Sequence, residues 1–423
     1  MTQSPRLFFR HVGQLATVVG LVVLVFNAHG QDRVTLPEGL TGPMVGFVTP
    51  TDATVWAYAG PGAKLELRYR PDNNHPAPMK VVPMTPKPED HDAAKVTLSG
   101  LTPATAYRYE VSLDGKTDPA WQGRFATAPT DGQPARFKMA VSSCMEVGDT
   151  PEQPSWYLML AERPAFQLLL GDNVYANTTD REHLWKFHRQ QRRVVEFAAM
   201  LRNTPTYAMW DDHDYGPNDS DGTAPGKENS LRAFRELFAN PAAGIDGTPG
   251  AFFRFNWGDV DFFMLDGRYH RSPDKAPNDD KKRMLGDGQF QWLVDGLKAS
   301  QAKFKVLASG STLDKSRDDG WKVYDFERKR LYQAIMGNKI GGVMYLSGDI
   351  HRCMVDQRPA SETGGYPLVE VISSGIANSK TQGFATLEFD TTVADPTVRI
   401  QIIHGDATTR LDRTLHLSEL QVK

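Results

Sequence analysis

The stretch "TYAMWDDHDYGPNDSDG", residues 206–222, places a short apolar run directly before five aspartates and a histidine. Like charges packed this closely repel one another, so the cluster needs a counter-charge. Two interpretations are open: a solvated acidic loop, or one wall of a cation-binding site. The run is dense in turn-forming residues and follows a strand-like segment, so the rest of the chain has to decide between them.

Short apolar runs that end in polar residues recur from Phe137 onward. Continuous apolar runs predict strands buried on both faces, and helical segments between them predict an α/β domain over residues 137–423. The runs are "RFKMAVSSC", "AFQLLLGDNVY", "TYAMWDDHD", "VDFFMLDGR", "FKVLASGST" and "GGVMYLSGDIH". Residues 154–163, 182–203 and 288–300 are predicted helices, and 383–390 and 397–405 are predicted antiparallel strands that complete a sheet.

The region before Phe137 has a different pattern. Residues 38–130 alternate apolar and polar side chains, are rich in β-branched and aromatic residues, and are divided by Gly and Pro, which predicts a small β-sandwich. "LSGLTPATAYRYEV" resembles a fibronectin type III module, in which a tyrosine stands near the start of a late strand. Residues 128–136, "APTDGQPAR", read as a linker to the α/β domain.

The N-terminus reads as a targeting segment. Within residues 1–30, Arg6 and Arg10 precede an apolar run near Ala16 to Phe26, and the small-residue pattern Ala28-His-Gly30 follows. This order predicts a signal peptide cleaved near Gly30, hence a secreted or periplasmic protein without a stable membrane span after cleavage. An uncleaved N-terminal anchor is the alternative.

Composition excludes some classes of partner. The 423 residues are 40% hydrophobic and 23% charged, as in ordinary globular proteins, and the net charge is −3. No basic field exists to recruit nucleic acid. The sequence carries no signal for an oligomeric state.

The ends of the apolar runs concentrate reactive side chains. Ligands of α/β sheets bind outside the carboxyl ends of the strands, so these residues are the ones to compare. They are Ser143-Cys144, Asp172 with Tyr175, Asp211-Asp212-His213, Asp266 with Arg268, and Asp349 with His351. Each is a weak signal alone, but carboxylates gathered at one edge need cations between them, and oxygen ligands with imidazole fit Fe, Mn, Zn or Ca.

The same motifs carry a family resemblance. "SSC", "GDNVY", "WDDHD", "MLDGRYHR", "MLGDGQFQWL" and "LSGDIH", in this order, resemble the PhoD-type alkaline phosphatase and phosphodiesterase family of calcineurin-like metallophosphoesterases. The match runs from about residue 137 to the C-terminus, and the N-terminal β-module fits the family layout. The resemblance implies an α/β fold with a four-layer αββα catalytic domain, preceded by the fibronectin type III-like sandwich. It also implies a centre of Fe(3+) and Ca(2+), with Zn or Mn as alternatives, that cleaves phosphate esters.

The resemblance assigns the metal ligands position by position. It implies that Cys144 takes the first ligand position, that Asp172 bridges, that Tyr175 binds ferric iron as a phenolate, and that Asp349 and His351 complete the centre. Asp211 or Asp212, with Asn218, would hold calcium. Neighbours on a strand face opposite ways, so one of the doublet is expected to coordinate directly. Analogy with the Asn-His step of related enzymes favours Asp212, and the spacing to Asn218 favours Asp211.

Several residues near these ligands have two interpretations each. Asp214, Asp219 and Asp221 are solvated loop residues or groups just outside the ligand set, and direct coordination by any one of them is the less favoured alternative. Asn177 departs from the family pattern, because relatives often carry an acidic residue there. Cys144 and Cys353 would form a disulfide by default in an exported protein, whereas the position of Cys144 favours a metal-bound thiolate.

The implied chemistry is metal-assisted ester hydrolysis. Metals lower the pKa of a bound water, orient the resulting hydroxide and neutralise phosphoryl charge. His213 is the candidate general acid for the leaving oxygen, or it only orients a ligand. Arg268 holds phosphate through its forked guanidinium, or it makes a structural pair with a nearby aspartate.

Two rival functions are also open. A non-catalytic calcium- or carbohydrate-binding surface protein would use the aspartate loops for calcium alone, but calcium requires neither the cysteine nor the tyrosine. A purple acid phosphatase-like monoesterase also combines a β-module with a metallophosphoesterase domain, but its "GNHE" step is replaced here by "WDDHD". Whether the substrate is a monoester or a diester is not encoded in these motifs.

Overall fold

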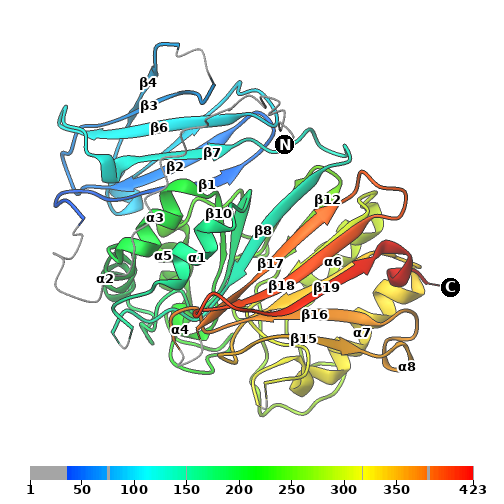
Figure 1. The fold of residues 1–423 in the computed structure, drawn as a ribbon. Helices are drawn as coiled ribbons and strands as arrows, with labels where there is room; N and C mark the ends of the chain where they lie inside the picture. Colours follow the sequence, from blue (N-terminus) through cyan, green and yellow to red (C-terminus); the bar gives the residue numbers. More distant parts are fainter. Residues whose placement is uncertain (1–35, 74–76, 149, 317, 379–381, 423) are drawn as a thin grey trace, which may run out of the picture. The chain divides into compact units, whose positions relative to one another are not determined.

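The computed structural model describes residues 36–73, 77–148, 150–316, 318–378 and 382–422. The expected signal peptide therefore lies outside the described residues. Within them, every helix is too short or too polar to cross a membrane. The described elements form an N-terminal sandwich followed by two larger sheets with helices (Figure 1).

The N-terminal region is a sandwich of two antiparallel sheets with strand orders β1-β2-β5 and β4-β3-β6-β7. Its strands are β1 Thr41–Val48, β2 Ala53–Tyr58, β3 Leu65–Pro71, β4 Lys80–Met84, β5 Ala93–Leu98, β6 Ala106–Leu113 and β7 Gln122–Ala126. Tyr107, near the start of β6, accepts a hydrogen bond at its hydroxyl from Thr102 N at 2.9 Å. This is the tyrosine corner typical of fibronectin-like sandwiches, which agrees with the resemblance of that segment.

Sheet I has the strand order β10-β9-β8-β17-β18-β19, and sheet II has the order β11-β12-β13-β14-β16-β15. The strands of sheet I are β8 Arg136–Ser142, β9 Phe166–Leu170, β10 Thr206–Met209, β17 Gly383–Asp390, β18 Thr397–His404 and β19 Thr409–His416. Those of sheet II are β11 Phe253–Trp257, β12 Val260–Met264, β13 Phe304–Ala308, β14 Val343–Ser347, β15 Cys353–Arg358 and β16 Leu368–Ser373. The central strands are parallel within each sheet, and the C-terminal β17 and β18 are antiparallel, as expected.

Aromatic side chains fill the space between the two sheets. Phe166 of β9 packs edge-on against Phe262 of β12 with ring centroids 5.3 Å apart, and Phe389 of β17 meets Phe304 of β13 at 5.4 Å. The next residue of β12, Phe263, points the other way and contacts Trp292 of helix α6. This alternation places sheet II between sheet I and the helices, which is the four-layer αββα arrangement expected from the sequence.

The helices are short, and most follow a parallel strand. They are α1 Ser155–Ala161, α2 Arg181–Arg192, α3 Val195–Asn203, α4 Asp212–Tyr215, α5 Lys227–Leu237, α6 Asp287–Ala299, α7 Asp325–Gly337 and α8 Ala360–Thr363. The segment 182–203, predicted as one helix, divides at Val194, whose backbone is extended. The break lies at the β-branched pair Val194-Val195, which favours extended backbone, and it lets α2 pack against α5 while α3 packs against α1 and β1.

Glu236 of α5 links the sandwich to the helices. Its buried carboxylate accepts hydrogen bonds from Arg181 Nη2 at 2.8 Å, from Trp185 Nε1 at 2.8 Å and from Arg232 Nε at 3.0 Å. Its backbone carbonyl accepts a hydrogen bond from Trp56 Nε1 of β2 at 2.9 Å. One residue thus organises donors from three elements.

Replacing Glu236 with Ala should destabilise the protein strongly. The substitution leaves the buried Trp185 Nε1 and two arginines without their shared acceptor, a loss of roughly 3 kcal/mol in the free energy of unfolding. Denaturant unfolding of the purified variant measures this. The control is Asp412→Ala, which removes the exposed partner of Arg399 and should change the midpoint little. Equal, small effects of the two substitutions would contradict the role given to Glu236.

Candidate metal centre

The predicted ligands converge because parallel strands end at the same edge of a sheet. Cys144 follows β8, Asp172 follows β9 and Asp211 follows β10, all in sheet I. Asp349 and His351 follow β14 of sheet II. Since the two sheets pack face to face, their carboxyl edges meet, and residues far apart in sequence lie side by side.

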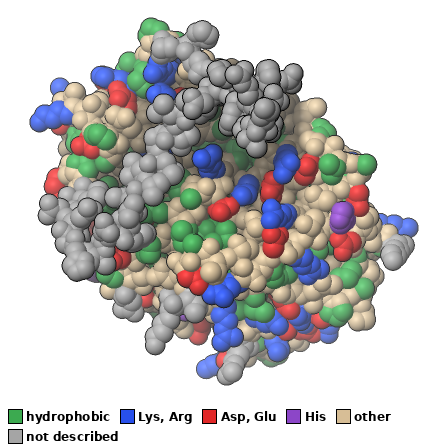
Figure 2. Space-filling model, in the orientation of Figure 1, with side chains coloured by type: hydrophobic (Ala, Val, Ile, Leu, Met, Phe, Trp, Pro, Cys, Tyr) green, Lys and Arg blue, Asp and Glu red, His purple; other side chains and the backbone are tan. Residues whose placement is uncertain are grey.

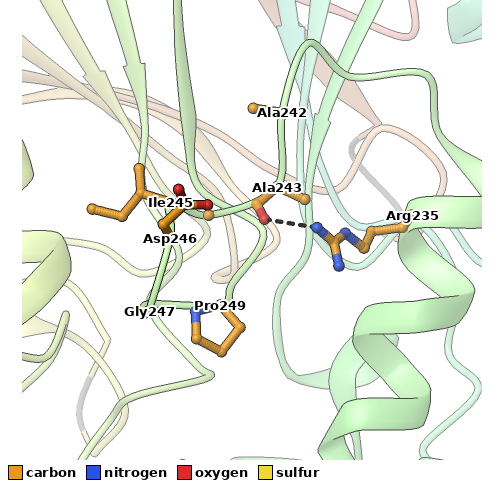
Figure 3. Close-up of a pocket in the computed structure, with 8 residues that line it drawn as sticks. Arg235, Ala242, Ala243, Ile245, Asp246, Gly247 and Pro249 are labelled. Atoms are coloured by element: carbon orange, nitrogen blue, oxygen red, sulfur yellow. Dashed lines mark hydrogen bonds between the residues drawn. The ribbon is translucent and has the colours of Figure 1, made fainter.

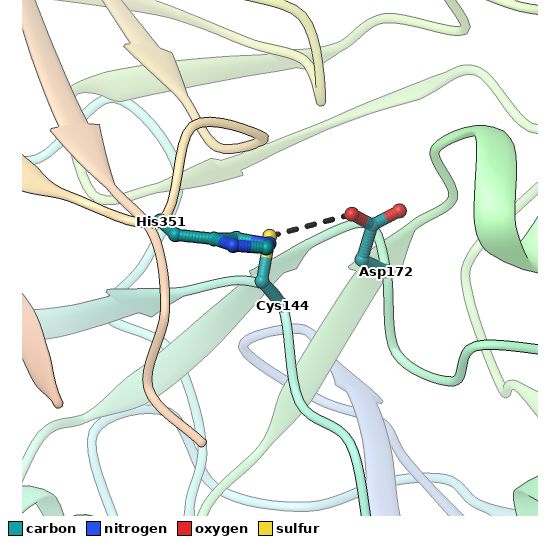
Figure 4. Close-up of side chains that lie close together, drawn as sticks. All are labelled: Cys144, Asp172 and His351. Atoms are coloured by element: carbon teal, nitrogen blue, oxygen red, sulfur yellow. Dashed lines mark hydrogen bonds between the residues drawn. The ribbon is translucent and has the colours of Figure 1, made fainter. Parts of the chain in front are cut away.

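Cys144, Asp172 and His351 form the first group, with one ligand atom of each within 4.8 Å of the others (Figure 4). The Cys144 Sγ lies 3.4 Å from Asp172 Oδ2, and the Tyr175 hydroxyl lies 3.4 Å from the same oxygen. The Tyr175 hydroxyl is also 2.9 Å from His351 Nε2. Thiol, carboxylate, phenol and imidazole thus face one another, the donor set expected from the sequence.

Two further groups continue from the first. Asp172, Asp212 and His213 have ligand atoms within 4.8 Å of one another, and so do Asp212, Asp219 and Asp319. Asp172 belongs to the first and second groups, and Asp212 belongs to the second and third. These two carboxylates therefore link the three groups into one continuous cluster.

The sequence predicted that the Asp211–Asp212 doublet continues the strand. In the structure it does not. Strand β10 ends at Met209, and Asp212 begins the one-turn helix α4. The turn is closed by Asp214, whose Oδ2 accepts a hydrogen bond from Asp211 N at 3.2 Å. Asp214 also accepts from Asn173 N at 3.1 Å, so this buried carboxylate joins the loops after β9 and β10. Asp214 is therefore not a solvated loop residue: its hydrogen bonds hold the two loops together.

The charge of the cluster is poorly balanced by the protein itself. Burial and neighbouring acids raise the pKa of Asp172 well above its usual range and raise that of Asp349 to about 8. Burial also raises the pKa of Asp211 to about 7. Asp212 differs, because Arg268 and His213 outweigh its burial and hold its pKa at about 2.

Buried oxygens in the cluster are left without hydrogen-bond partners. They are Asp172 Oδ1, Asp211 Oδ2 and Asp349 Oδ2. A buried carboxylate oxygen without a partner is costly, and a cation removes that cost. The donor set and these oxygens therefore fit bound metal ions.

Arg268 is a buried positive charge in contact with the aspartates of the cluster. Its side chain is fully buried, its Nε donates to Asp211 Oδ1 at 2.5 Å, and its Nη1 donates to Asp319 Oδ1 at 2.9 Å. Arg271 pairs with the same Asp319. Because both edges of the Arg268 guanidinium are occupied, these contacts favour the structural pairing over the phosphate-binding role.

Backbone conformation around the ligands is unusual. Cys144, Asp172, Asp349 and His351 all have positive φ, at 60°, 49°, 72° and 53°. Non-glycine residues adopt this region at a cost, and such residues gather at functional sites. Gly310 permits the close approach of Asp211, since a Cβ at this position would lie 2.4 Å from Asp211 Cγ.

His213 lies at the edge of the group and is half-buried. Its Nδ1 is 2.6 Å from Asn177 Oδ1, and its ring packs on the Tyr175 ring with centroids 4.2 Å apart. Since the amide oxygen only accepts, Nδ1 carries a proton and Nε2 is free to face a ligand. Asn177, noted in the sequence as a departure from the family pattern, thus orients His213.

Sequence reasoning missed three residues of this neighbourhood. Asp319 lies on the long loop after β13, Ser374 follows β16, and Asn378 Nδ2 is 3.3 Å from His351 Nε2. Asp219, for which several interpretations were open, lies in the third group. Asn218, predicted to hold calcium, is exposed in the turn before Asp219. Ser374 directly follows the apolar strand β16 and was detectable on that ground. Asp319 lies well beyond the end of β13, so only the course of its loop brings it here, and the choice between Asn218 and Asp219 likewise depends on a turn.

Cys144 and Cys353 are both free thiols in this structure. Burial raises the pKa of each to about 11 in the absence of a cation. Cys353 donates to Ser374 O, with its Sγ 3.6 Å from that oxygen. The structure therefore lacks the disulfide that the cysteine count permitted.

Other surface features carry less chemistry. A cavity of about 410 Å³ lies between Arg235 of α5 and the loop 242–249, where Arg235 donates to Ala243 O (Figure 3). None of its lining residues belongs to the three ligand groups. On the face drawn in Figure 2, basic and acidic side chains of the described residues are interspersed rather than gathered by sign.

Comparisons with solved structures agree with this architecture. A structure of PhoD superposes with a TM-score of 0.74 at 17% identity, covering 90% of this chain and 92% of that one. The purple acid phosphatase PPD1 from yellow lupin (Lupinus luteus) seeds superposes with a TM-score of 0.63 at 13% identity, covering 89% and 74%. At such identities the similarity is one of fold.

Sequence comparison is more specific. Residues 37–130 match a domain of unknown function, DUF7800. Alkaline phosphatase D of Bacillus subtilis (strain 168) is 23% identical over 318 residues, which are 63% of this chain and 54% of that protein. The matched region thus spans about half of the relative's length. Residues 139–412, which contain every predicted metal ligand, match the model of the PhoD-like phosphatases, and the chain belongs to that family.

Proposed function

We propose that this protein is an exported, metal-dependent phosphoric ester hydrolase that cleaves phosphomonoesters, phosphodiesters or both. The observation that carries the proposal is that the edges of the two sheets bring together Cys144, Asp172, Tyr175, Asp212 and His351, beside buried carboxylate oxygens that lack partners. Membership of the PhoD-like phosphatase family supports the reaction class.

The proposed ligands divide by chemistry. Cys144, Asp172, Tyr175 and His351 would hold iron, because thiolate and phenolate favour a ferric ion. Asp212, with Asp219 and Asp319 nearby, offers the oxygen ligands that calcium takes. Asp211 and Asp349 line the same cluster, and Asn218 remains a ligand only by family resemblance. Bound ions would lower the pKa of water and neutralise charge on the phosphoryl oxygens.

The chain's own residues supply positioning and a proton. Arg268 holds Asp211 and Asp319 in place through buried ion pairs. His213 lies beside Asp172 and Asp212, and Asn177 orients its ring through Nδ1. To protonate a leaving oxygen from Nε2, His213 would act as the doubly protonated imidazolium, whose charge the neighbouring Asp212 stabilises although burial lowers the pKa of the ring. Asp214 keeps the loops of Asp172 and Asp211 together.

Removal of metal should abolish hydrolysis. Chelation should lower turnover of mono- and diester substrates by roughly a hundredfold or more, since metals supply several kcal/mol of charge stabilisation. Elemental analysis of the native protein should find iron and calcium, and Asp212→Asn should reduce metal content. Asp221→Asn, in the same loop but outside the ligand groups, is the matched control.

Two outcomes would decide against this proposal, and a third would narrow its substrate class. Full activity after complete removal of metal would exclude the metal-dependent reaction. Calcium binding without hydrolysis of any ester in the panel would favour the rival, a non-catalytic binding protein. Hydrolysis restricted to monoesters would favour a purple acid phosphatase-like activity.

Replacing His213 with Ala should separate alkyl from aryl substrates. An alkoxide needs a proton to leave, whereas a nitrophenolate leaves without help, so turnover of alkyl esters should fall far more, by roughly a hundredfold. His183→Ala, which alters an exposed histidine of α2, should change neither. Equal losses on alkyl and aryl esters, at full metal occupancy measured on the same sample, would leave His213 an orienting residue only.

Export rests on the N-terminal pattern of residues 1–30. The mature chain should begin just after Gly30, and the intact mass of protein recovered outside the cytoplasm checks this. Recovery of the chain with Met1 still attached would support the uncleaved anchor instead.

A further inference from the structure

Ser374 joins two of the proposed iron ligands. Its buried Oγ lies 3.1 Å from Cys144 Sγ and accepts a hydrogen bond from His351 N at 2.8 Å. Ser374 stands at the carboxyl end of β16 in sheet II, whereas Cys144 follows β8 in sheet I. One hydroxyl thus connects a ligand from each sheet.

The donor and acceptor in each hydrogen bond of the Ser374 hydroxyl follow from the number of protons that the groups carry. A serine hydroxyl has one proton to donate. Ser374 receives the His351 N–H, so its own proton is directed at the sulfur. Ser143 Oγ is also near, 3.3 Å from Cys144 Sγ, but it donates to Ser373 O at 3.1 Å. Among the serine hydroxyls of the described residues in contact with Cys144, Ser374 is therefore the one whose proton is available to the thiolate. The Tyr175 hydroxyl also contacts the thiol, but as a phenolate in the proposed centre it has no proton to donate.

The surrounding backbone holds this geometry. Gly375 N and Ile376 N donate to Ser143 O at 3.1 and 3.2 Å, and Ala377 N donates to Cys144 O at 3.3 Å. The loop after β16 is therefore fastened along the loop of Cys144. Ser374 cannot rotate away from the sulfur without breaking its bond to His351 N.

We propose that Ser374 is a positioning residue that sets how strongly the Cys144 thiolate donates electrons to bound iron. This inference rests on the proposed function, in which Cys144 and Tyr175 bind ferric iron. A hydrogen bond to a metal-bound sulfur withdraws electron density from it and thereby tunes the metal's electronic properties and affinity. The same hydroxyl fixes the distance between the Cys144 and His351 ligand positions.

Replacing Ser374 with Ala tests the role without relying on activity. Ferric iron bound by thiolate and phenolate should give the wild-type protein a visible charge-transfer band. Without the hydrogen bond, the sulfur donates more strongly, so the band of Ser374→Ala should move to longer wavelength. Iron affinity should fall roughly 10–100-fold, as for other residues that orient metal ligands.

Ser373→Ala is the matched control. Ser373 Oγ donates to Val141 O at 2.6 Å and accepts from Ala385 N at 2.9 Å, so this variant loses a similar pair of buried bonds away from the sulfur. Its band should match that of the wild type. Ser374→Thr keeps the hydroxyl and should restore the wild-type band, and circular dichroism of the metal-free variants verifies that each is folded.

The outcomes separate this inference from the proposed function. A wild-type band that stays unchanged in folded, iron-loaded Ser374→Ala overturns the role of Ser374 and leaves the iron assignment intact. Wild-type protein that is fully loaded with ferric iron and shows no visible band overturns the thiolate and phenolate ligation itself, and this inference with it. Equal band shifts in Ser373→Ala and Ser374→Ala also overturn the specific role of Ser374.

Discussion

Repulsion among buried carboxylates is the constraint on which the rest of this structure depends. Asp172, Asp211, Asp212 and Asp349 meet at the junction of two sheets, where little water screens their charges. Two buried arginines, Arg268 and Arg271, partly neutralise this charge and pair with Asp319 beside the cluster. They pair with Asp211, Asp212 and Asp319, whereas Asp172, Asp349 and, at its second oxygen, Asp211 each retain a buried oxygen that a bound cation would satisfy.

The same constraint accounts for the local backbone. Each ligand must turn sharply out of a buried strand to reach the junction, which places Cys144, Asp172, Asp349 and His351 in the left-handed region. Glycines allow the strand ends to approach one another at this junction. Buried aromatic contacts between the sheets fix the positions of the strands from which these turns emerge.

Much of the site was predictable because its residues end apolar runs. Parallel strands bring such residues together whatever the details of the fold, so Cys144, Asp172, Asp212 and His351 could be grouped from pattern alone. Site residues whose positions depend on turns and loops were harder to predict from the sequence. The one-turn helix at Asp212 replaces an expected strand, and it presents Asp219 rather than Asn218 to its neighbours. The division at Val194 likewise depends on which neighbour each half packs against.

Because the ligands come from both sheets, a bound cation would also link sheet I to sheet II. Cys144 and Asp172 belong to sheet I and His351 to sheet II, and a long stretch of chain separates them in sequence. A cation held by all three would close that large loop, so its binding energy would resist opening of the seam between the sheets. Because the ligands come from both sheets, the complete site would form only after the two sheets have packed together. Metal binding would therefore be the last step that stabilises the folded chain.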